Sequence, residues 1–256
     1  MIVIIDAHAH VFRQAYGHRT PRPAQEYLAQ MDASGVQGGV LVQPSFLGTN
    51  HGEIIEAHAV APDRFRAVGV ADESFTRDEM RRLHASGVRG LRFNFFKGST
   101  VDLAAPAWRR VIEMIEPQGW HLELNIPEPG WVQVLAQVAG LTIPMTIDHL
   151  GRPDPELRAT GPGFRALLAA AAKQTLYAKT TAPFRITMRA QRECLAAWVG
   201  AHGSHRVLWG SDAPWVDVKD PPAYADTLSW LDDAGLSASD RAAILGLNSR
   251  TLFGFP

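Results

Sequence analysis

Short apolar segments rich in β-branched residues alternate with helical patterns along the whole chain, and this alternation limits the fold more than any other feature. Strands are predicted near residues 2–6, 38–43, 65–70, 88–93, 120–125, 143–148, 175–179 and 206–210. Helices are expected around 23–33, 52–61, 77–85, 105–116, 131–139, 163–173, 189–201 and 222–232, with a further helix near 238–246. Strands that alternate with helices form parallel sheets. The predicted fold is therefore α/β, a single (β/α)₈ TIM barrel that spans residues 1–256 as one domain.

A doubly wound open sheet is the rival architecture. Such a sheet normally places a glycine-rich phosphate-binding turn directly after its first strand. The corresponding stretch here reads Asp6-Ala7-His8-Ala9-His10 and contains no glycine. The closed barrel is therefore the favoured interpretation.

The composition narrows the classes of partner. A formal net charge of −1 over 256 residues gives no electrostatic reason to expect a nucleic-acid or membrane partner. No apolar run reaches the ~18 residues of a membrane span, and the first residues lack the charged segment of a signal peptide. We expect a cytoplasmic protein that acts on a small molecule, and the sequence does not indicate its oligomeric state.

Two histidines stand at the end of the first predicted strand. Side chains at positions i and i+2 of a strand lie on the same face, about 6.6 Å apart. His8 and His10 therefore both point into the mouth of the barrel, where they can share one metal ion or one substrate oxygen. The alternative is a pair of polar histidines at a strand terminus with no chemical role.

An aspartate follows the eighth predicted strand, in the segment Leu208-Trp209-Gly210-Ser211-Asp212. In a closed barrel the last strand neighbours the first, so Asp212 is expected close to His8 and His10. A carboxylate in that place can remove a proton from water or bind a metal. The alternative is an aspartate that caps a helix or forms a turn.

The sixth predicted strand ends in Ile147-Asp148-His149. If Met145 and Ile147 fill the barrel interior, alternation also turns His149 inward, whereas Asp148 faces the helices. His149 then becomes a third imidazole at the mouth. Arg152, shortly after it, either binds a substrate anion or is an ordinary loop residue.

Polar residues also alternate with apolar ones in the fourth and fifth predicted strands, and so face the interior. A buried arginine such as Arg92 needs an anionic partner, which is either the substrate or a structural carboxylate. Asn125 lies nearest the mouth and is expected to contact substrate, whereas Glu123 is either a partner of Arg92 or a metal ligand. Weaker candidates in the loops and strand ends are Ser45, Lys179 and Arg185.

Together these segments resemble the amidohydrolase superfamily, specifically its amidohydrolase-2 branch of TIM-barrel hydrolases. The resemblance covers the whole chain, through the segments around His8, His149 and Asp212 and the closing segment 248–254. Segments 43–50 and 87–95 are most similar to the 2-pyrone-4,6-dicarboxylate hydrolases of that branch, to which sugar lactonases are related.

The resemblance implies hydrolysis of a lactone or a similar activated ester. Asp212 would be the general base, while His8, His10 and His149 would polarise the carbonyl group. Arg92 and Arg185 would hold a substrate carboxylate. The chain differs at Lys97-Gly98-Ser99, where a dicarboxylate-specific enzyme would offer another arginine.

The resemblance leaves the cofactor open between no metal and one Zn²⁺ on His8, His10 and Asp212, since three protein ligands plus water suit a catalytic zinc site. The alternative functions are a metal-dependent decarboxylase or deaminase-like member of the superfamily and a non-catalytic barrel that binds a small acid. A base beside three imidazoles has no use in a pure binding protein, which argues against the last.

Overall fold

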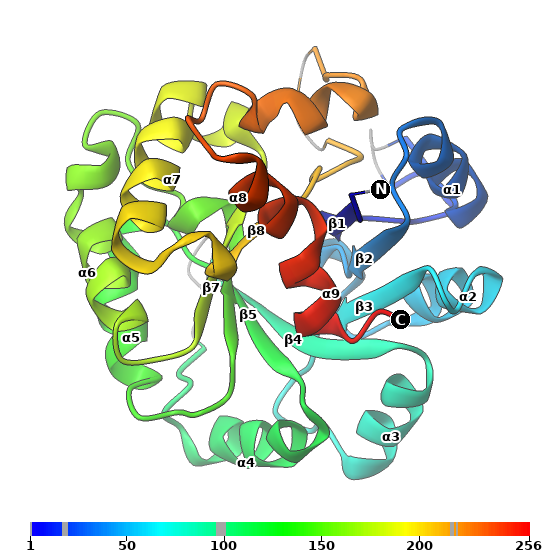
Figure 1. Cartoon of the computed structure of the whole chain (residues 1–256). Helices are drawn as coiled ribbons and strands as arrows, with labels where there is room; N and C mark the ends of the chain where they lie inside the picture. The colour runs from blue at the N-terminus through cyan, green and yellow to red at the C-terminus, as the bar shows by residue number, and fades with distance from the viewer. Residues whose placement is uncertain (1, 17–19, 96–100, 216–217, 219) are drawn as a thin grey trace.

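One sheet of eight parallel strands runs through the centre of the molecule (Figure 1). The computed structural model describes residues 2–16, 20–95, 101–215, 218 and 220–256. In that part of the chain each strand pairs with the next one in sequence. The strands are β1 (Ile5–Ala9), β2 (Gly38–Val42), β3 (Phe65–Gly69), β4 (Val88–Asn94), β5 (His121–Asn125), β6 (Met145–Ile147), β7 (Leu176–Thr180) and β8 (Val207–Trp209). The predicted (β/α)₈ barrel is confirmed.

Helices follow the strands and surround the sheet (Figure 1). The α-helices are α1 (Ala24–Ala33), α2 (Gly52–Val60), α3 (Arg77–Ala85), α4 (Pro106–Ile115), α5 (Trp131–Gln137), α6 (Pro162–Ala171), α7 (Met188–His202), α8 (Ala238–Ala242) and α9 (Asn248–Phe253). The helix expected around 222–232 is a 3-10 helix, Tyr224–Leu231, and the one near 238–246 continues through a π-helical turn, Ala243–Leu247, into α9. None of the helices in the described ranges combines the length and the apolar character needed to cross a membrane.

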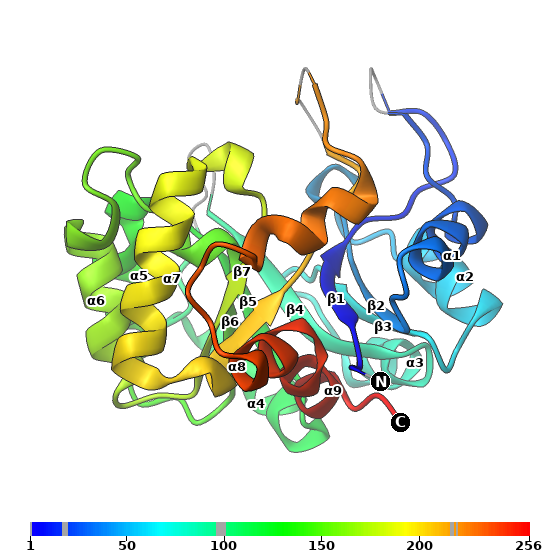
Figure 2. The ribbon, with the colours of Figure 1, turned by 45° about the horizontal axis from the view of Figure 1, so that its top comes forward.

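Two layers of side chains pack against the sheet. The outer layer joins strands to helices and includes Leu122 and Met145 from the strands with Trp131 from α5. The inner layer is small and consists of Ala7, Val40, Val42, Val68, Leu208 and Phe253. Phe253 comes from α9, which lies at the opposite end of the barrel from the loops that follow β1 and β8 (Figure 2). One end of the barrel is therefore filled by an aromatic side chain, and the carboxyl ends of the strands remain for the site.

Two backbone hydrogen bonds join the end of β1 to the segment after β8. The amide of Asp212 donates to the carbonyl oxygen of His8 at 2.8 Å, and the amide of His10 donates to that of Ala213 at 2.7 Å. We call this junction the seam. It places the two segments that carry the predicted catalytic residues side by side.

A buried carboxylate, Asp6, stabilises the seam from the outer side. It accepts hydrogen bonds from the hydroxyl groups of Tyr27 at 2.9 Å, Tyr224 at 3.0 Å and Ser211 at 2.6 Å, and from the Ser211 amide at 2.9 Å. Arg22 stacks on the Tyr27 ring and donates to two carbonyl oxygens of the seam. Such satisfied polar clusters hold a buried region in one arrangement.

Gly246 and Gly200 should respond oppositely to replacement by alanine. A Cβ atom at Gly246 would collide with the carbonyl oxygen of Val3, whereas one at Gly200 in α7 would meet nothing within 4 Å. We expect G246A to lower the free energy of unfolding by about 1–3 kcal/mol through overpacking. G200A should raise it by about 0.5–1 kcal/mol, because alanine loses less backbone entropy in a helix. Urea denaturation measures both, and equal stability of the two variants would contradict this packing.

Candidate active site

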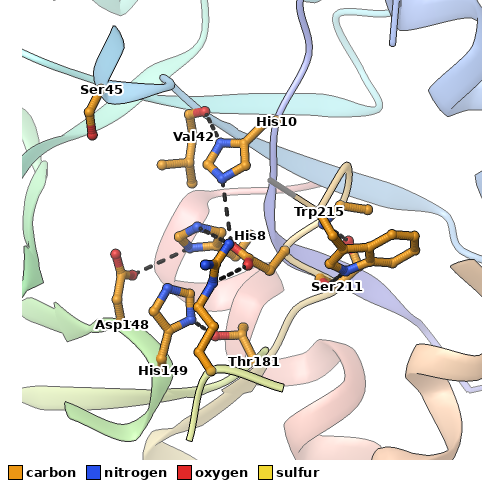
Figure 3. A network of polar contacts seen from close by, with 12 residues as sticks. His8, His10, Val42, Ser45, Asp148, His149, Thr181, Ser211 and Trp215 are labelled. Carbon is orange, nitrogen blue, oxygen red and sulfur yellow. Dashed lines mark hydrogen bonds and ion pairs between the residues drawn. The ribbon is translucent and has the colours of Figure 1, made fainter. Parts of the chain in front are cut away.

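Three imidazoles, from His8, His10 and His149, converge at the mouth of the barrel (Figure 3), where the carboxylate of Asp212 lies beside two of them. Nε2 of His8 and Nε2 of His10 lie 3.4 and 3.5 Å from Oδ1 of Asp212. The ring centroid of His8 is 5.1 Å from that of His10 and 5.4 Å from that of His149. The expected convergence of these four residues therefore occurs, although they come from the first, sixth and eighth strand ends.

Left-handed backbone conformations determine the direction of several side chains at the mouth. The φ angles are 52° at His149, 53° at Leu150, 47° at Arg152 and 59° at Asp212. Residues other than glycine adopt this region rarely, and they keep it only where the surrounding structure enforces it. At Asp212 the hydrogen bond of its amide across the seam contributes that constraint.

The prediction that Asp148 faces the helices is wrong. Met145 and Ile147 pack in the outer layer, so alternation turns Thr146 and Asp148 into the barrel. Oδ1 of Asp148 lies 3.3 Å from Nδ1 of His8, at the end of β1. His149 still points inward because its positive φ angle breaks the alternation. The correct parity could have been found from Thr146, the polar residue between two apolar ones.

A buried network of charges lies beneath the imidazoles. Arg92 donates to Oδ2 of Asp148 from Nε at 3.0 Å and from Nη2 at 2.8 Å, and its Nε lies 3.3 Å from Oε1 of Glu123. Lys179 donates to Glu123 and lies 3.8 Å from Asp148. Burial opposes ionisation of Asp148, but Arg92 above all holds the pKa of its carboxyl group well below the usual range. Arg92 and Glu123 thus take part in internal ion pairs, and the substrate-binding role of Arg92 stays a prediction.

Hydrogen bonds orient two of the imidazole rings. Nδ1 of His10 lies 2.7 Å from the carbonyl oxygen of Val42, and Nδ1 of His149 lies 2.6 Å from Oγ1 of Thr181 (Figure 3). A carbonyl oxygen only accepts, so Nδ1 of His10 carries its proton. Thr181 was not predicted as a site residue, and its position directly after β7 is the one sequence signal that could have indicated it.

The electrostatic environment sets the protonation of the site. Burial opposes ionisation of Asp212, but above all His149, and then Arg185, hold the pKa of this carboxyl group well below its usual range. Burial, assisted by His8 and Arg185, lowers the pKa of His149 to about 3. Burial also lowers the pKa of His10. At neutral pH the site therefore offers one carboxylate beside neutral His10 and His149.

One of the arginines predicted to bind substrate, Arg185, lies beside this carboxylate, and its charge also acts on Arg152. Nε of Arg185 donates to Oδ2 of Asp212 at 2.9 Å. Burial and then the charge of Arg185 lower the pKa of Arg152 to about 10. The positive charges of Arg152 and Arg185 thus act on one another at the mouth, which is an arrangement that attracts anions.

The other predicted substrate contacts are Asn125 and Ser45. Asn125 is buried, and its Oδ1 accepts no hydrogen bond from the described residues. Ser45 is exposed, accepts a hydrogen bond from Asn94 at 2.8 Å and lies apart from the histidines in Figure 3. The segment 97–99, where the sequence departs from a dicarboxylate-specific pattern, lies outside the described residues.

The spacing of the donor atoms fits a metal ion. His8, His10 and Asp212 form one group of atoms close enough to share an ion, and His8, Asp148 and His149 form a second. Zinc ligands at about 2.0–2.1 Å in a tetrahedral site lie about 3.3 Å apart, close to the separations of His8 and His10 from Asp212. Nε2 of His8 is buried and makes no hydrogen bond to any residue that the structure describes. The predicted ligand set is therefore geometrically able to hold a metal.

Known proteins resemble the chain over nearly its whole length. The sequence model of the amidohydrolase family matches residues 5–255. A 4-sulfomuconolactone hydrolase from Hydrogenophaga intermedia is 27% identical over 266 residues, which cover 97% of this chain and 88% of that protein.

Solved structures agree with this match. A Pseudomonas putida protein assigned as a 2-pyrone-4,6-dicarboxylic acid hydrolase superposes with a TM-score of 0.92 and 30% identity, over 100% of this chain and 98% of its own. An Acinetobacter baumannii protein assigned the same activity, with citric acid bound, gives a TM-score of 0.90 and 28% identity, over 98% and 99% of the two chains.

His149 should stay neutral in the folded protein far below the pH at which a free histidine takes up a proton. Its pKa of about 3, lowered by burial, lies below the unfolded value near 6.5. Between these values the unfolded chain binds a proton that the native state does not, so this residue lowers the stability of the fold as the pH falls through that window. NMR titration of the His149 ring from pH 8 to pH 5 should show no protonation, with the urea-unfolded chain as control. A midpoint near pH 6 in the folded protein would contradict the burial of this ring.

Proposed function

We propose that this chain, which belongs to the amidohydrolase family and is a hydrolase, opens the ring of a lactone that carries an acidic group. The observation that supports this most is the convergence of an ionised Asp212 and three imidazoles at one point of the barrel mouth. The relatives' names describe hydrolases of lactones with acidic substituents, 4-sulfomuconolactone and 2-pyrone-4,6-dicarboxylate.

In the proposed reaction Asp212 accepts a proton from the attacking water. The water oxygen bonds to the ring carbonyl carbon, and the carbonyl oxygen takes up negative charge. His8 and His149 can donate to that oxygen and stabilise the charge, in the manner of an oxyanion hole, whereas Nε2 of His10 presents an electron pair at the mouth. The ring C–O bond then breaks, and the departing oxygen takes the proton back from Asp212, so that one water is consumed for each ring opened.

The charges near the mouth match an acidic substrate. Arg152 and Arg185 lie where a substrate carboxylate would relieve their mutual repulsion. Arg92 contributes less to binding of the substrate's acidic group, because its Nε and Nη2 groups already contact Asp148 and Glu123. Asn125 and Ser45 would form hydrogen bonds with polar groups of the substrate on the side away from these arginines.

Charge balance favours catalysis by these side chains without a metal. Glu123, Asp148 and Asp212 are each paired with a cation, from Lys179, Arg92 and Arg185 respectively. A divalent ion would therefore enter a cluster whose carboxylates are already neutralised. If bound, zinc would be held by His8, His10 and Asp212 and would act as a Lewis acid that activates water.

Replacement of Asp212 by asparagine tests the proposed base. D212N keeps the size of the side chain but cannot take a proton, so kcat/KM for 2-pyrone-4,6-dicarboxylate or 4-sulfomuconolactone should fall by about 10²–10⁴-fold. D233N, at an exposed aspartate paired with Arg192 on the surface, is the matched control and should retain activity. Undiminished hydrolysis by D212N, after correction for spontaneous ring opening, would refute the assignment.

Replacement of Arg152 by methionine tests recognition of the acidic group. Loss of a charge-assisted hydrogen bond costs about 1.5–3 kcal/mol, so R152M should raise KM for an acidic lactone by about 10–100-fold. A neutral lactone of the same ring size lacks the group that Arg152 would bind, and its KM should change much less. Equal effects on both substrates would show that Arg152 does not contact the acidic group.

A further inference from the structure

Three side chains lie within reach of the inner ring nitrogen of His8. Nδ1 of His8 lies 3.3 Å from Nζ of Lys179, with hydrogen-bond geometry, 3.3 Å from Oδ1 of Asp148 and 3.5 Å from Oε1 of Glu123. All of these side chains are fully buried. Whichever neighbour bonds to Nδ1 decides which nitrogen of the ring carries the proton.

The geometry favours Lys179. A lysine ammonium group has three donors and no acceptor, so Nδ1 must be the acceptor of this bond. Oδ1 of Asp148 and Oε1 of Glu123 make no hydrogen bond within the described part of the chain, so neither oxygen accepts the ring N–H in this geometry. A neutral His8 therefore carries its proton on Nε2, the atom that lies 3.4 Å from Asp212 at the mouth.

His10 has the opposite arrangement, although it belongs to the same strand end. Its Nδ1 donates to the carbonyl oxygen of Val42, so its Nε2 has a free electron pair. The two imidazoles that flank Asp212 thus present a donor from His8 and an acceptor from His10. A ligand atom for zinc needs an electron pair, which His10 offers and His8 in this tautomer does not.

We propose that Lys179 is a positioning residue that fixes His8 as the Nε2–H tautomer, which makes His8 a hydrogen-bond donor at the mouth and weakens metal binding there. Binding of zinc through Nε2 of His8 requires the proton to move to Nδ1, where the carboxylates of Asp148 and Glu123 are acceptors within reach and the bond from Lys179 is lost. The role of this donor toward a carbonyl oxygen rests on the proposed function, but the tautomer itself does not.

The tautomer is measured directly by two-bond ¹⁵N–¹H correlation NMR of histidine-labelled protein at pH 8, with the His8 signal assigned by its loss in H8Q. We expect the Nε2–H form at His8 and the Nδ1–H form at His10. An Nδ1–H form or an imidazolium at His8 in the unmodified protein would overturn the proposal without reference to activity. This measurement remains decisive even if every variant at Lys179 fails to fold.

The double variant E123M/K179M removes the ion pair as a unit, so the net charge of the cluster is unchanged. Replacement of a buried ion pair by apolar side chains of similar volume is often tolerated. His8 should then change to the Nδ1–H tautomer, because Asp148 is left as its partner, while His10 stays unchanged as an internal control. E123Q retains the ammonium group and should keep the Nε2–H form. An Nε2–H form that persists in the double variant would contradict the role of Lys179.

Zinc affinity gives an independent readout. Outer partners of metal-binding histidines typically change affinity by 10–100-fold, so calorimetric titration should show zinc binding to E123M/K179M at least tenfold tighter than to the unmodified protein. The unchanged net charge removes simple attraction as an explanation. Equal zinc affinity in a variant whose His8 has changed tautomer would overturn the link between Lys179 and metal binding.

Discussion

The arrangement of the site depends on the seam where β8 meets β1. Asp6 is buried there, and a buried carboxylate is tolerated only when hydrogen-bond donors surround it. Two tyrosine hydroxyl groups, a serine and backbone amides supply those donors, and they come from both sides of the seam. The same contacts hold the backbone of His8 against that of Asp212. The contacts that close the barrel therefore also fix the geometry of the proposed catalytic residues.

Inside the barrel, ion pairs take the place that a hydrophobic core usually has. The aliphatic inner layer is small, and above it Arg92, Glu123, Asp148 and Lys179 neutralise one another. Such a network is costly unless each charge is matched, but once matched it fixes side-chain positions closely. The imidazoles at the mouth lie above this network of ion pairs, and its contacts determine which ring nitrogen of His8 carries a proton.

The sequence was sufficient to predict the barrel, because alternating strands and helices leave few other architectures. It also brought His8, His10, His149 and Asp212 together, since strand ends of a closed barrel meet at one face. It failed for Asp148, because β6 has only three residues and the apolar residues beside Thr146 face outward. Lys179 was only a weak candidate, because His8, the site residue that it contacts, lies 171 positions away in the chain. Left-handed backbone at Arg152 has no signal in residue type, and at Asp212 the signal is only the weak preference of aspartate for that region.

The seam also has a consequence for how the protein is made. Asp6 and its partner Ser211 are separated by 205 positions, so the donors that satisfy this carboxylate emerge from the ribosome long after it. At a synthesis rate of about 5–20 residues per second, β1 waits on the order of ten seconds or more with one edge unpaired. An exposed strand edge is a template for wrong pairing with other chains. The free edge of the first strand therefore needs protection in the nascent chain. That need ends only when the segment after the eighth strand has been made and can pair with it.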